Sequence, residues 1–149
     1  MHTFVAAGVA FLLAVLWFDL MFDVQTRANP STPLPADVLT SISAYYRRVT
    51  IDAYPMNRLV SLVMLLTLGT LVAEIVQGVR PWWVGWVSLA LVMSGVVFTL
   101  TRTVPNARRL GGGQDTPEVQ SILARAIYRD HLMSFVRTTV VLALQLIAR

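Results

Sequence analysis

The stretch that decides the fold is WWVGWVSLALVMSGVVFTLT, residues 82–101, which contains no Asp, Glu, Lys or Arg. Since a helix needs about 20 mostly apolar residues to cross the hydrocarbon core of a bilayer, this stretch predicts a transmembrane helix. Three further stretches of similar character predict three more such helices: residues 4–22, 59–77 and 132–148. A soluble chain of 149 residues could not bury four of them, because too little other material remains to cover them.

The composition of the whole chain favours the same class of protein. Hydrophobic residues make up 56% and charged residues 13% of the sequence, and that share of charge is about half of what an average soluble domain carries. This balance argues against a soluble enzyme and excludes a disordered chain. Cysteine is absent, so the sequence offers no disulfide and no thiolate metal site. We therefore predict an all-α integral membrane four-helix bundle, a single membrane domain over residues 1–149.

All 12 basic residues are arginines, and their positions predict how the bundle is oriented. Nine of them lie in the connections 23–58 and 102–131, whereas Arg80 and Arg149 lie on the opposite side. The positive-inside rule therefore places both long connections in the cytoplasm and both termini outside, in a bacterial inner (plasma) membrane. The arginines form no dense basic stripe, so we expect contacts with membrane lipid heads and no nucleic-acid partner.

Each cytoplasmic connection contains an amphipathic segment that starts at a proline. Residues 36–49 follow Pro35, and residues 117–130 begin at Pro117, where the residue type suits a first helical turn. Apolar residues recur on one face of both segments, which predicts two amphipathic interfacial helices on the cytoplasmic side. No proline or glycine separates the second segment from residues 132–148, so those two can also form one long helix. The two segments align at a shift of 82 residues, and this match is explained equally well by an internal repeat and by chance.

Polar residues of the four predicted helices gather near the cytoplasmic side. Arg137 is the most informative of them, because an unpaired charge at its depth costs roughly 2.5–3.5 kcal/mol. One interpretation is an Asp19–Arg137 ion pair that fixes the helix register. The other is a polar pocket open to the inner leaflet. The residues of this layer are Asp19, Asp23, Asn57, Arg58, Arg102, Asn106, Arg129, Asp130, His131 and Arg137.

His131 also has two interpretations. It could act as a general base or as a metal ligand beside Asp19 and Asp23, or it could be a structural histidine at the interface. We predict no metal site, because the common triad of two histidines and one carboxylate is not available here. Phosphate-binding loops, dinucleotide fingerprints, zinc-protease motifs and nucleophile elbows are also absent from the sequence. The sequence therefore does not identify a cofactor, and whether the protein uses one is unknown.

Three short motifs give the chain a resemblance to a known family. Residues 54–57 read YPMN before the second span, residues 103–106 read TVPN after the third, and His131 precedes Arg137 and Thr138 in the fourth. With the order of the spans and the long first and third connections, these motifs resemble the anthrone-oxygenase-like family of small four-helix membrane proteins. The chain departs from the family at the third-helix exit, which lacks one residue and its first asparagine. It also has Tyr128 near the position where tryptophans commonly precede the fourth helix.

The resemblance implies an oxidoreductase that acts on a lipophilic aromatic molecule of the anthrone or quinone type. Matching of the motifs implies that Asn57, Asn106 and His131 are catalytic and orient or deprotonate the substrate. Arg137 and Arg102 would stabilise a phenolate or enolate, because a fixed positive charge in a dry site favours a developing anion. The remaining residues predicted to bind substrate are Asp19 and Asp23.

A second interpretation is a non-catalytic bundle. It would be an accessory subunit of a larger membrane complex or a lipid-binding scaffold, alone or as a homo-oligomer. The polar layer is then structural, and Gly69, Gly85 and Gly95 mark close contacts between helices. A transporter that works as an oligomer is a third option.

Overall fold

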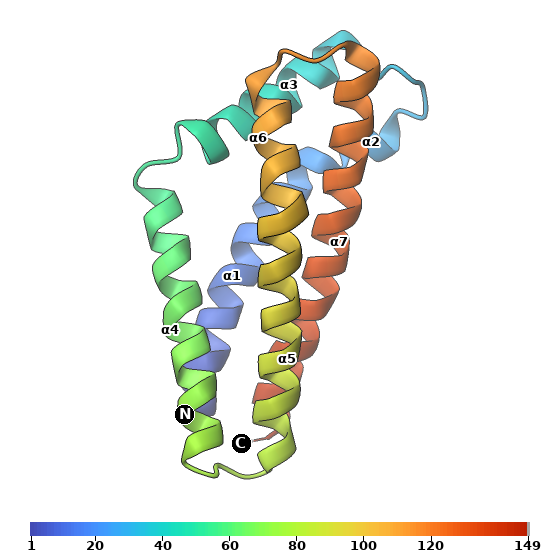
Figure 1. Ribbon diagram of the computed structural model, residues 1–149. Helices are drawn as coiled ribbons and strands as arrows, with labels where there is room; N and C mark the ends of the chain where they lie inside the picture. The colour runs from blue at the N-terminus through green and yellow to red at the C-terminus, as the bar shows by residue number, and fades with distance from the viewer. Residues whose placement is uncertain (149) are drawn as a thin grey trace.

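The computed structural model describes residues 1–148, and over this range the fold is all-α (Figure 1). The long helices of the described chain are α1 (His2–Asp23), α4 (Met56–Val76), α5 (Trp82–Phe98) and α7 (Pro117–Ile147). Each, alone or with a helical continuation, is long and apolar enough to cross a membrane. The four predicted helices are thus confirmed, with bounds that differ from the predicted ones mainly where helices extend further.

The four long helices form a ring in which α1 contacts α4, α4 contacts α5, α5 contacts α7, and α7 returns to α1. Successive helices run in opposite directions, so both ends of the described chain lie at one end of the bundle and the long connections at the other (Figure 1). We call these the terminal end and the cap end. Arg149, one of the arginines used for the predicted orientation, lies outside the described residues.

The third long helix extends well beyond the predicted span. α5 continues through a π-helical turn, η2 (Thr99–Thr103), into α6 (Val104–Gly112). Pro105 accounts for the irregular turn, because proline lacks the N–H that would bond to the carbonyl of Thr101. The helix ends at Gly113, whose φ of 63° is a left-handed conformation that glycine adopts without strain. The connection predicted at residues 102–131 is therefore almost entirely helical.

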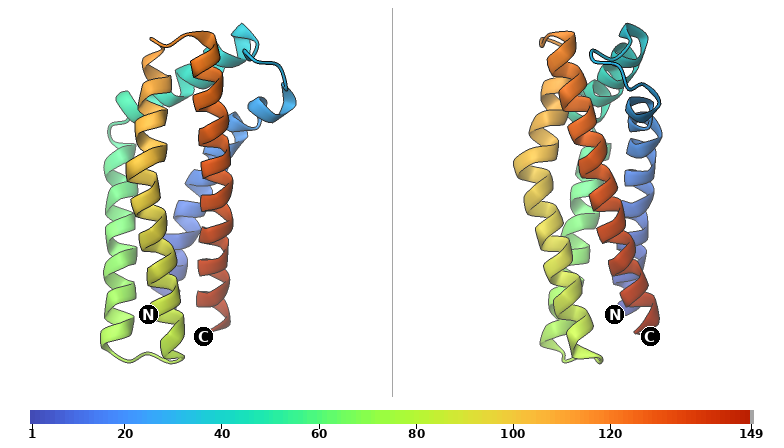
Figure 2. Two further views of the ribbon diagram at one scale, coloured as in Figure 1. Left: turned by 45° about the vertical axis from the view of Figure 1, so that its right-hand side comes forward. Right: turned by 90° about the vertical axis from the view of Figure 1, so that its right-hand side faces the viewer.

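The two predicted interfacial helices differ from each other in the structure. The first forms α3 (Ala36–Tyr46), which ends in a π-helical turn, η1 (Arg47–Ile51), and lies across the cap end after the single turn α2 (Gln25–Ala28). Figure 2 shows α3 beyond the membrane-length part of the bundle, beside the first turns of α7. The second, residues 117–130, is the first part of α7 itself, so the prediction of a separate helix there is wrong. The alternative of one long helix is confirmed, because nothing in the sequence breaks it.

We call residues 24–55 together with α6 and the first part of α7 (residues 117–130) the cap. The cap has an apolar core of its own, whereas the bundle turns many apolar side chains outward. Large exposed residues on the bundle include Leu65, Leu66, Val76 and Val136, a distribution that a bundle surrounded by lipid requires. The buried cluster inside the bundle is small: Val5, Val9, Leu71 and Val141. The cap core is larger and consists of Leu34, Val38, Leu39, Ile42, Tyr46, Ala107, Leu110, Leu123, Ala124 and Ile127.

Glycines allow close approaches between helices, at two of the three predicted positions. A Cβ on Gly85 would lie 3.0 Å from a side-chain carbon of α4, and a Cβ on Gly95 would lie 3.1 Å from Arg137 Nη1. Gly69 has no heavy atom of another element within 4 Å of its Cβ position in the described chain, so that prediction is wrong. Gly95 has a direct consequence for the candidate site, because it makes room for the Arg137 side chain.

A backbone contact at Gly111 joins the end of α3 to α6. A Cβ at this position of α6 would lie 2.7 Å from the backbone nitrogen of Arg47, closer than real Cβ contacts come. The end of α3 therefore rests directly on the α6 backbone, and this contact positions Tyr45 and Tyr46 over the bundle.

Candidate functional site

Five polar side chains from three helices meet where the bundle joins the cap. Asp19 and Asp23 come from α1, Tyr45 and Tyr46 from α3, and His131 from α7. The two aspartates share a helix face because they are four residues apart. We call this group the cap-end cluster. It contains three of the predicted site residues, whereas the sequence analysis did not identify the two tyrosines as part of it.

Asp23 is at the centre of the cap-end cluster and is completely buried. Its Oδ2 lies 2.7 Å from His131 Nδ1, and its Oδ1 accepts a hydrogen bond of 2.5 Å from the Tyr46 hydroxyl. Two such donors offset the free energy of removing a carboxylate from water. Asp23 thereby places the imidazole proton on Nδ1. The other ring nitrogen, Nε2, lies 4.0 Å from Asp19 Oδ2, which is too far for a hydrogen bond.

Asp19 is held by the cap in the same manner. The Tyr45 hydroxyl donates a hydrogen bond of 2.6 Å to Asp19 Oδ1, and the Tyr45 ring stacks on Phe22 of α1 at a centroid distance of 4.0 Å. Burial, and then the negative charge of Asp19, raise the pKa of the Tyr45 phenol. Burial and the charge of Asp23 raise the pKa of the Tyr46 phenol well above its usual value. Both phenols therefore stay protonated and act as donors at neutral pH.

The cap-end cluster is largely enclosed. Within residues 1–148, none of its side-chain nitrogen or oxygen atoms is fully buried without a hydrogen-bond partner, and its two atoms without a hydrogen bond, His131 Nε2 and Asp19 Oδ2, lie 4.0 Å apart. His131 is only 8% exposed, and it lines neither of the two grooves described below. The cluster ties α1, α3 and α7 together, and a molecule bound in either groove would not touch His131 directly.

The three predicted catalytic residues lie on three different helices, α4, α6 and α7. Asn57 is exposed at the start of α4, where its Oδ1 accepts a hydrogen bond of 2.8 Å from the backbone N–H of Arg58. Asn106 is half-buried in α6, and across the described chain no side-chain hydrogen bond joins either asparagine to His131. α4 lies diagonally opposite α7 in the ring, which explains the separation of Asn57 from His131. Their catalytic assignment stays a prediction.

Arg102 is engaged by the protein itself. Its Nε lies 3.3 Å from Asp130 Oδ2, and its guanidinium carbon lies over the Phe98 ring, 5.4 Å from the centroid. Asp130 is fully buried on α7 and also accepts a long hydrogen bond of 3.5 Å from Thr103. This pair links η2 to α7, so the positive charge of Arg102 already has a carboxylate beside it.

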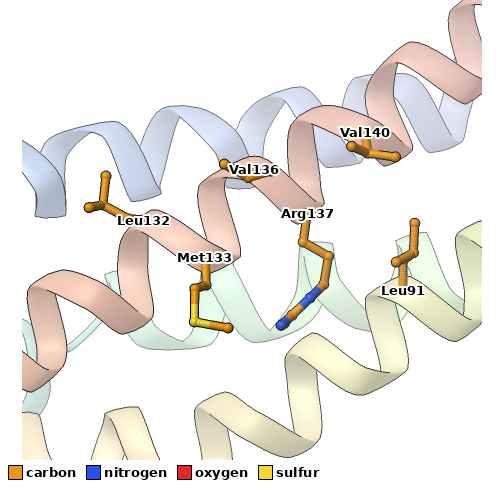
Figure 3. A pocket seen from close by; sticks show the side chains of 6 residues that line it. All are labelled: Leu91, Leu132, Met133, Val136, Arg137 and Val140. Atoms are coloured by element: carbon orange, nitrogen blue, oxygen red, sulfur yellow. The ribbon is translucent and has the colours of Figure 1, made fainter.

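Arg137 lies in an open groove between α5 and α7. The groove has a volume of about 500 Å³ and is lined by Leu91, Leu132, Met133, Val136, Arg137 and Val140. Figure 3 shows the Arg137 side chain extending from α7 toward α5, with Leu91 on the facing helix. Arg137 is the one charged residue of this lining, and we call the feature the Arg137 groove.

The guanidinium of Arg137 is incompletely paired. Its Nη1 is buried and has no hydrogen-bond partner among residues 1–148. Its nearest aromatic neighbour is Phe98, whose ring centroid is 6.0 Å from the guanidinium carbon. The predicted Asp19–Arg137 ion pair is wrong, because in the described chain no oxygen of Asp19 comes within 4.0 Å of Arg137. Asp19 turns toward α3 and Arg137 turns toward α5, on different faces of the bundle.

A second groove provides a comparison. It lies between α1 and α7 and has a volume of about 400 Å³. Its lining carries no charge and consists of Ala10, Leu13, Ala14, Trp17, Phe18 and Phe135. Such a surface suits an acyl chain of the surrounding lipid and offers no charged group to a ligand.

A second polar cluster, which was not predicted from the sequence, lies at the terminal end of the bundle. Each long helix contributes one buried side chain to it: His2 from α1, Glu74 from α4, Ser88 from α5 and Gln145 from α7. His2 Nδ1 lies 2.7 Å from Gln145 Oε1 and 3.1 Å from Glu74 Oε1. The Gln145 amide nitrogen donates to Ser88 Oγ at 3.1 Å and to Glu74 Oε2 at 3.4 Å. We call this group the terminal-end cluster.

The signal for this cluster was present in the sequence but weak. Glu74 and Gln145 are polar residues near the ends of apolar spans, and His2 precedes the first span. Only the arrangement of the helices shows that they meet. The predicted concentration of polar groups in one layer is therefore incomplete, because the structure has one such layer at each end.

Neither cluster resembles a standard metal centre. In the part of the chain that the structure describes, no group of three or more His, Asp or Glu side chains is arranged to hold a metal ion. A scan against protein-family models, a search of curated proteins and a search of solved structures each found no match to the chain.

Proposed function

We propose that the protein is an integral membrane protein that binds a lipophilic aromatic molecule in the Arg137 groove. The molecule would carry an anionic or carbonyl oxygen, as anthrones and quinones do. The cap, which carries most of the arginines, would face the cytoplasm, and the groove would open to the inner half of the membrane. This extends the observation that the chain has four helices long and apolar enough to cross a membrane.

The observation that carries this proposal is the unpartnered Nη1 of Arg137 in an otherwise apolar groove. By helix rise, Arg137 lies about 9 Å along α7 from His131 and about 12 Å from Gln145, at mid-depth in the bundle. A buried guanidinium donor without an acceptor is unfavourable. An oxygen atom of a bound lipophilic molecule would supply the acceptor, while the apolar lining would contact its rings.

The test is binding of 1,8-dihydroxyanthraquinone to the protein in lipid nanodiscs, followed by quenching of tryptophan fluorescence. We expect Arg137→Leu to weaken binding by about 10- to 100-fold, since a hydrogen bond to a charged group contributes about 1.5–3 kcal/mol. The matched control is Arg129→Leu, which removes an exposed arginine of the same helix. Equal affinity of the wild type and Arg137→Leu would contradict the proposal.

A more specific proposal is that the protein catalyses oxidation of the bound molecule. The resemblance to anthrone-oxygenase-like proteins supports it. The same nanodiscs are supplied with an anthrone under air, and formation of the anthraquinone is followed by absorbance. Conversion that depends on Arg137 would make the protein an oxidoreductase.

A lipid-binding scaffold or accessory subunit is the second candidate, and the position of His131 favours it. His131 Nδ1 is engaged by Asp23 and Tyr46, and the residue lines neither groove. In this case the wild-type protein binds no aromatic probe. The thermal stability of Arg137→Leu separates the two candidates further: the scaffold requires a structural role for Arg137 and hence a lower Tm. The groove proposal expects an unchanged or higher Tm, since an unpaired buried charge is lost.

A further inference from the structure

We propose that the Arg137 groove holds one anionic phospholipid of the inner leaflet. The phosphate would bind Arg102, an ester carbonyl oxygen would accept a hydrogen bond from Arg137, and one acyl chain would lie along the apolar lining. This inference goes beyond the aromatic ligand proposed above, and it rests on the proposed orientation with the cap in the cytoplasm. An aromatic molecule that binds in the same groove would compete with the lipid, so the lipid would regulate its binding.

Two arginines from facing helices lie beside one aromatic ring. The guanidinium carbon of Arg102 is 5.4 Å from the centroid of the Phe98 ring, and that of Arg137 is 6.0 Å from the same centroid. Among residues 1–148, the one carboxylate paired with either arginine is that of Asp130, whose Oδ2 lies 3.3 Å from Arg102 Nε. Two positive charges and one negative charge leave an excess of one positive charge. A phospholipid headgroup with a single net negative charge would neutralise this excess.

Both arginines have donors available for a ligand. Arg102 faces Asp130 through its Nε, its side chain is 43% exposed, and no side-chain hydrogen bond in the described chain occupies its two Nη atoms. Arg137 Nη1 also has no hydrogen-bond partner within that range. A guanidinium presents several N–H groups in one plane, which matches the oxygens of a phosphate. The exposed fork of Arg102 therefore suits the phosphate, and the deeper Arg137 suits an uncharged carbonyl oxygen.

The depths of the two arginines match the order of the groups in a phospholipid. Arg102 lies level with Asp130, just before the predicted fourth span, so it is at the boundary of the hydrocarbon core. Arg137 follows Asp130 by seven residues on α7 and is therefore about 10 Å deeper by helix rise. In a phospholipid, the ester groups lie between the phosphate and the acyl chains. The phosphate would thus meet Arg102 first, and an ester carbonyl would meet Arg137 below it.

The lining of the groove faces the bilayer and suits an acyl chain. Leu132, Met133, Val136 and Val140 are between 41% and 63% exposed. Figure 3 shows these four side chains along α7, with the Arg137 side chain among them. The lining extends from Leu132 to Val140, which is about 12 Å along the helix by helix rise. A lipid chain can enter this groove sideways from the membrane, without any opening of the bundle.

The groove between α1 and α7 indicates what the arginines add. It is also open and apolar, but its lining carries no charge. We therefore expect acyl chains to occupy it without preference for a headgroup. Basic pockets between transmembrane helices on the cytoplasmic side are a recurrent form of site for anionic lipid headgroups. Of the two grooves, the Arg137 groove has this character.

The experiment titrates the full-length protein, freed of lipid in detergent, with dioleoylphosphatidylglycerol or with dioleoylphosphatidylcholine. Native mass spectrometry counts the lipids bound per chain. The two lipids have the same acyl chains and differ in the net charge of the headgroup. We expect the first phosphatidylglycerol to bind about tenfold more tightly than phosphatidylcholine, because it adds a charged hydrogen-bonded pair. Equal affinities would overturn this inference, whereas a failure of 1,8-dihydroxyanthraquinone to bind would overturn only the proposed function.

Arg137→Gln removes the excess positive charge, so it should abolish most of the preference and leave phosphatidylcholine binding nearly unchanged. The matched control is Arg129→Gln, which removes an exposed arginine of the same helix and should keep the preference. The double variant Arg102→Gln, Asp130→Asn removes the phosphate contact without leaving Asp130 unpaired, and it should also weaken phosphatidylglycerol binding. Full preference in Arg137→Gln would overturn the inference. An equal loss in Arg129→Gln would also overturn it, because the preference would then come from the overall charge of the cap.

Discussion

The two polar clusters of this bundle are built from similar parts but are completed differently. Each joins a histidine to a carboxylate between α1 and the other helices: His131 with Asp23 at the cap end, and His2 with Glu74 at the terminal end. At the cap end two phenols add further donors, so both oxygens of Asp23 and Oδ1 of Asp19 accept hydrogen bonds. At the terminal end one imidazole hydrogen faces two oxygens, and one oxygen remains without a donor in the described chain.

The difference shows that the number of donors, more than the presence of histidine and carboxylate, decides what a buried cluster can do. A saturated cluster holds helices together and rejects ligands, because a ligand would have to displace good hydrogen bonds. A cluster that leaves a buried carboxylate oxygen without a donor holds its helices together less firmly. The amphipathic helix α3 supplies the phenols at the cap end, and no comparable element covers the terminal end among residues 1–148 (Figure 1).

The largest expected effect comes from breaking the saturated cluster. Asp23→Ala leaves His131 Nδ1 and the Tyr46 hydroxyl without their acceptor, and each orphaned buried group costs about 1–3 kcal/mol. We expect the free energy of unfolding in detergent to fall by about 2–6 kcal/mol. The control is Asp52→Ala, which removes only an exposed ion pair with Arg47 and should cost less than about 1 kcal/mol. An equal effect of both variants would contradict the central role of Asp23.

A smaller effect is expected from removing one donor. Tyr46→Phe should lower the free energy of unfolding by about 1.5–3 kcal/mol, because it deletes one buried hydrogen bond to a carboxylate. Tyr45→Phe, at a half-buried position, should cost about 1 kcal/mol. Chemical unfolding of both variants in detergent measures this difference, and a larger loss for Tyr45→Phe would reverse our ranking of the two phenols.

The phenol of Tyr46 also predicts a pH dependence of the free energy of unfolding. The pKa of Tyr46 is raised above its usual value of 10.0 in the folded protein. The folded state therefore holds more protons than the unfolded state once the pH exceeds 10, and stability falls as the pH rises further. Below that pH this group contributes no change. The decline of the wild type above pH 10 should be smaller in Tyr46→Phe, and an identical decline would assign it to other groups.

The smallest effect on stability is expected from a substitution in the terminal-end cluster. Glu74→Gln replaces a carboxylate that has an unpartnered oxygen with a neutral amide, so it should change the free energy of unfolding by less than about 1 kcal/mol. Thermal and chemical unfolding measure this. A loss as large as that of Asp23→Ala would show that the 3.1 Å contact with His2 is a strong ion pair, and the contrast between the clusters would disappear.

Part of the candidate site could be predicted from the sequence, and part could not. The spacing of Asp19 and Asp23 put both on one helix face, and the depth of His131 matched theirs, so their meeting was foreseeable. The surroundings of Arg137 could not be foreseen, because the depth of a residue along a helix does not tell which neighbouring helix its side chain faces. The same reason explains Asn57, which lies at a suitable depth but on the helix diagonally opposite α7.

The sequence by itself determined the four long helices, the connections that lie together at one end, and the concentration of arginines there. These follow from hydropathy and residue counts, which are properties of local segments and of the bilayer thickness. Only the tertiary structure decided which polar groups pair, that Gly95 makes room for Arg137, and that His2, Glu74, Ser88 and Gln145 converge. The pairings depend on the order of the helices in the ring and on the rotation of each helix about its axis. Neither can be read from one segment of sequence, because both are set by apolar contacts between helices that have little directional preference.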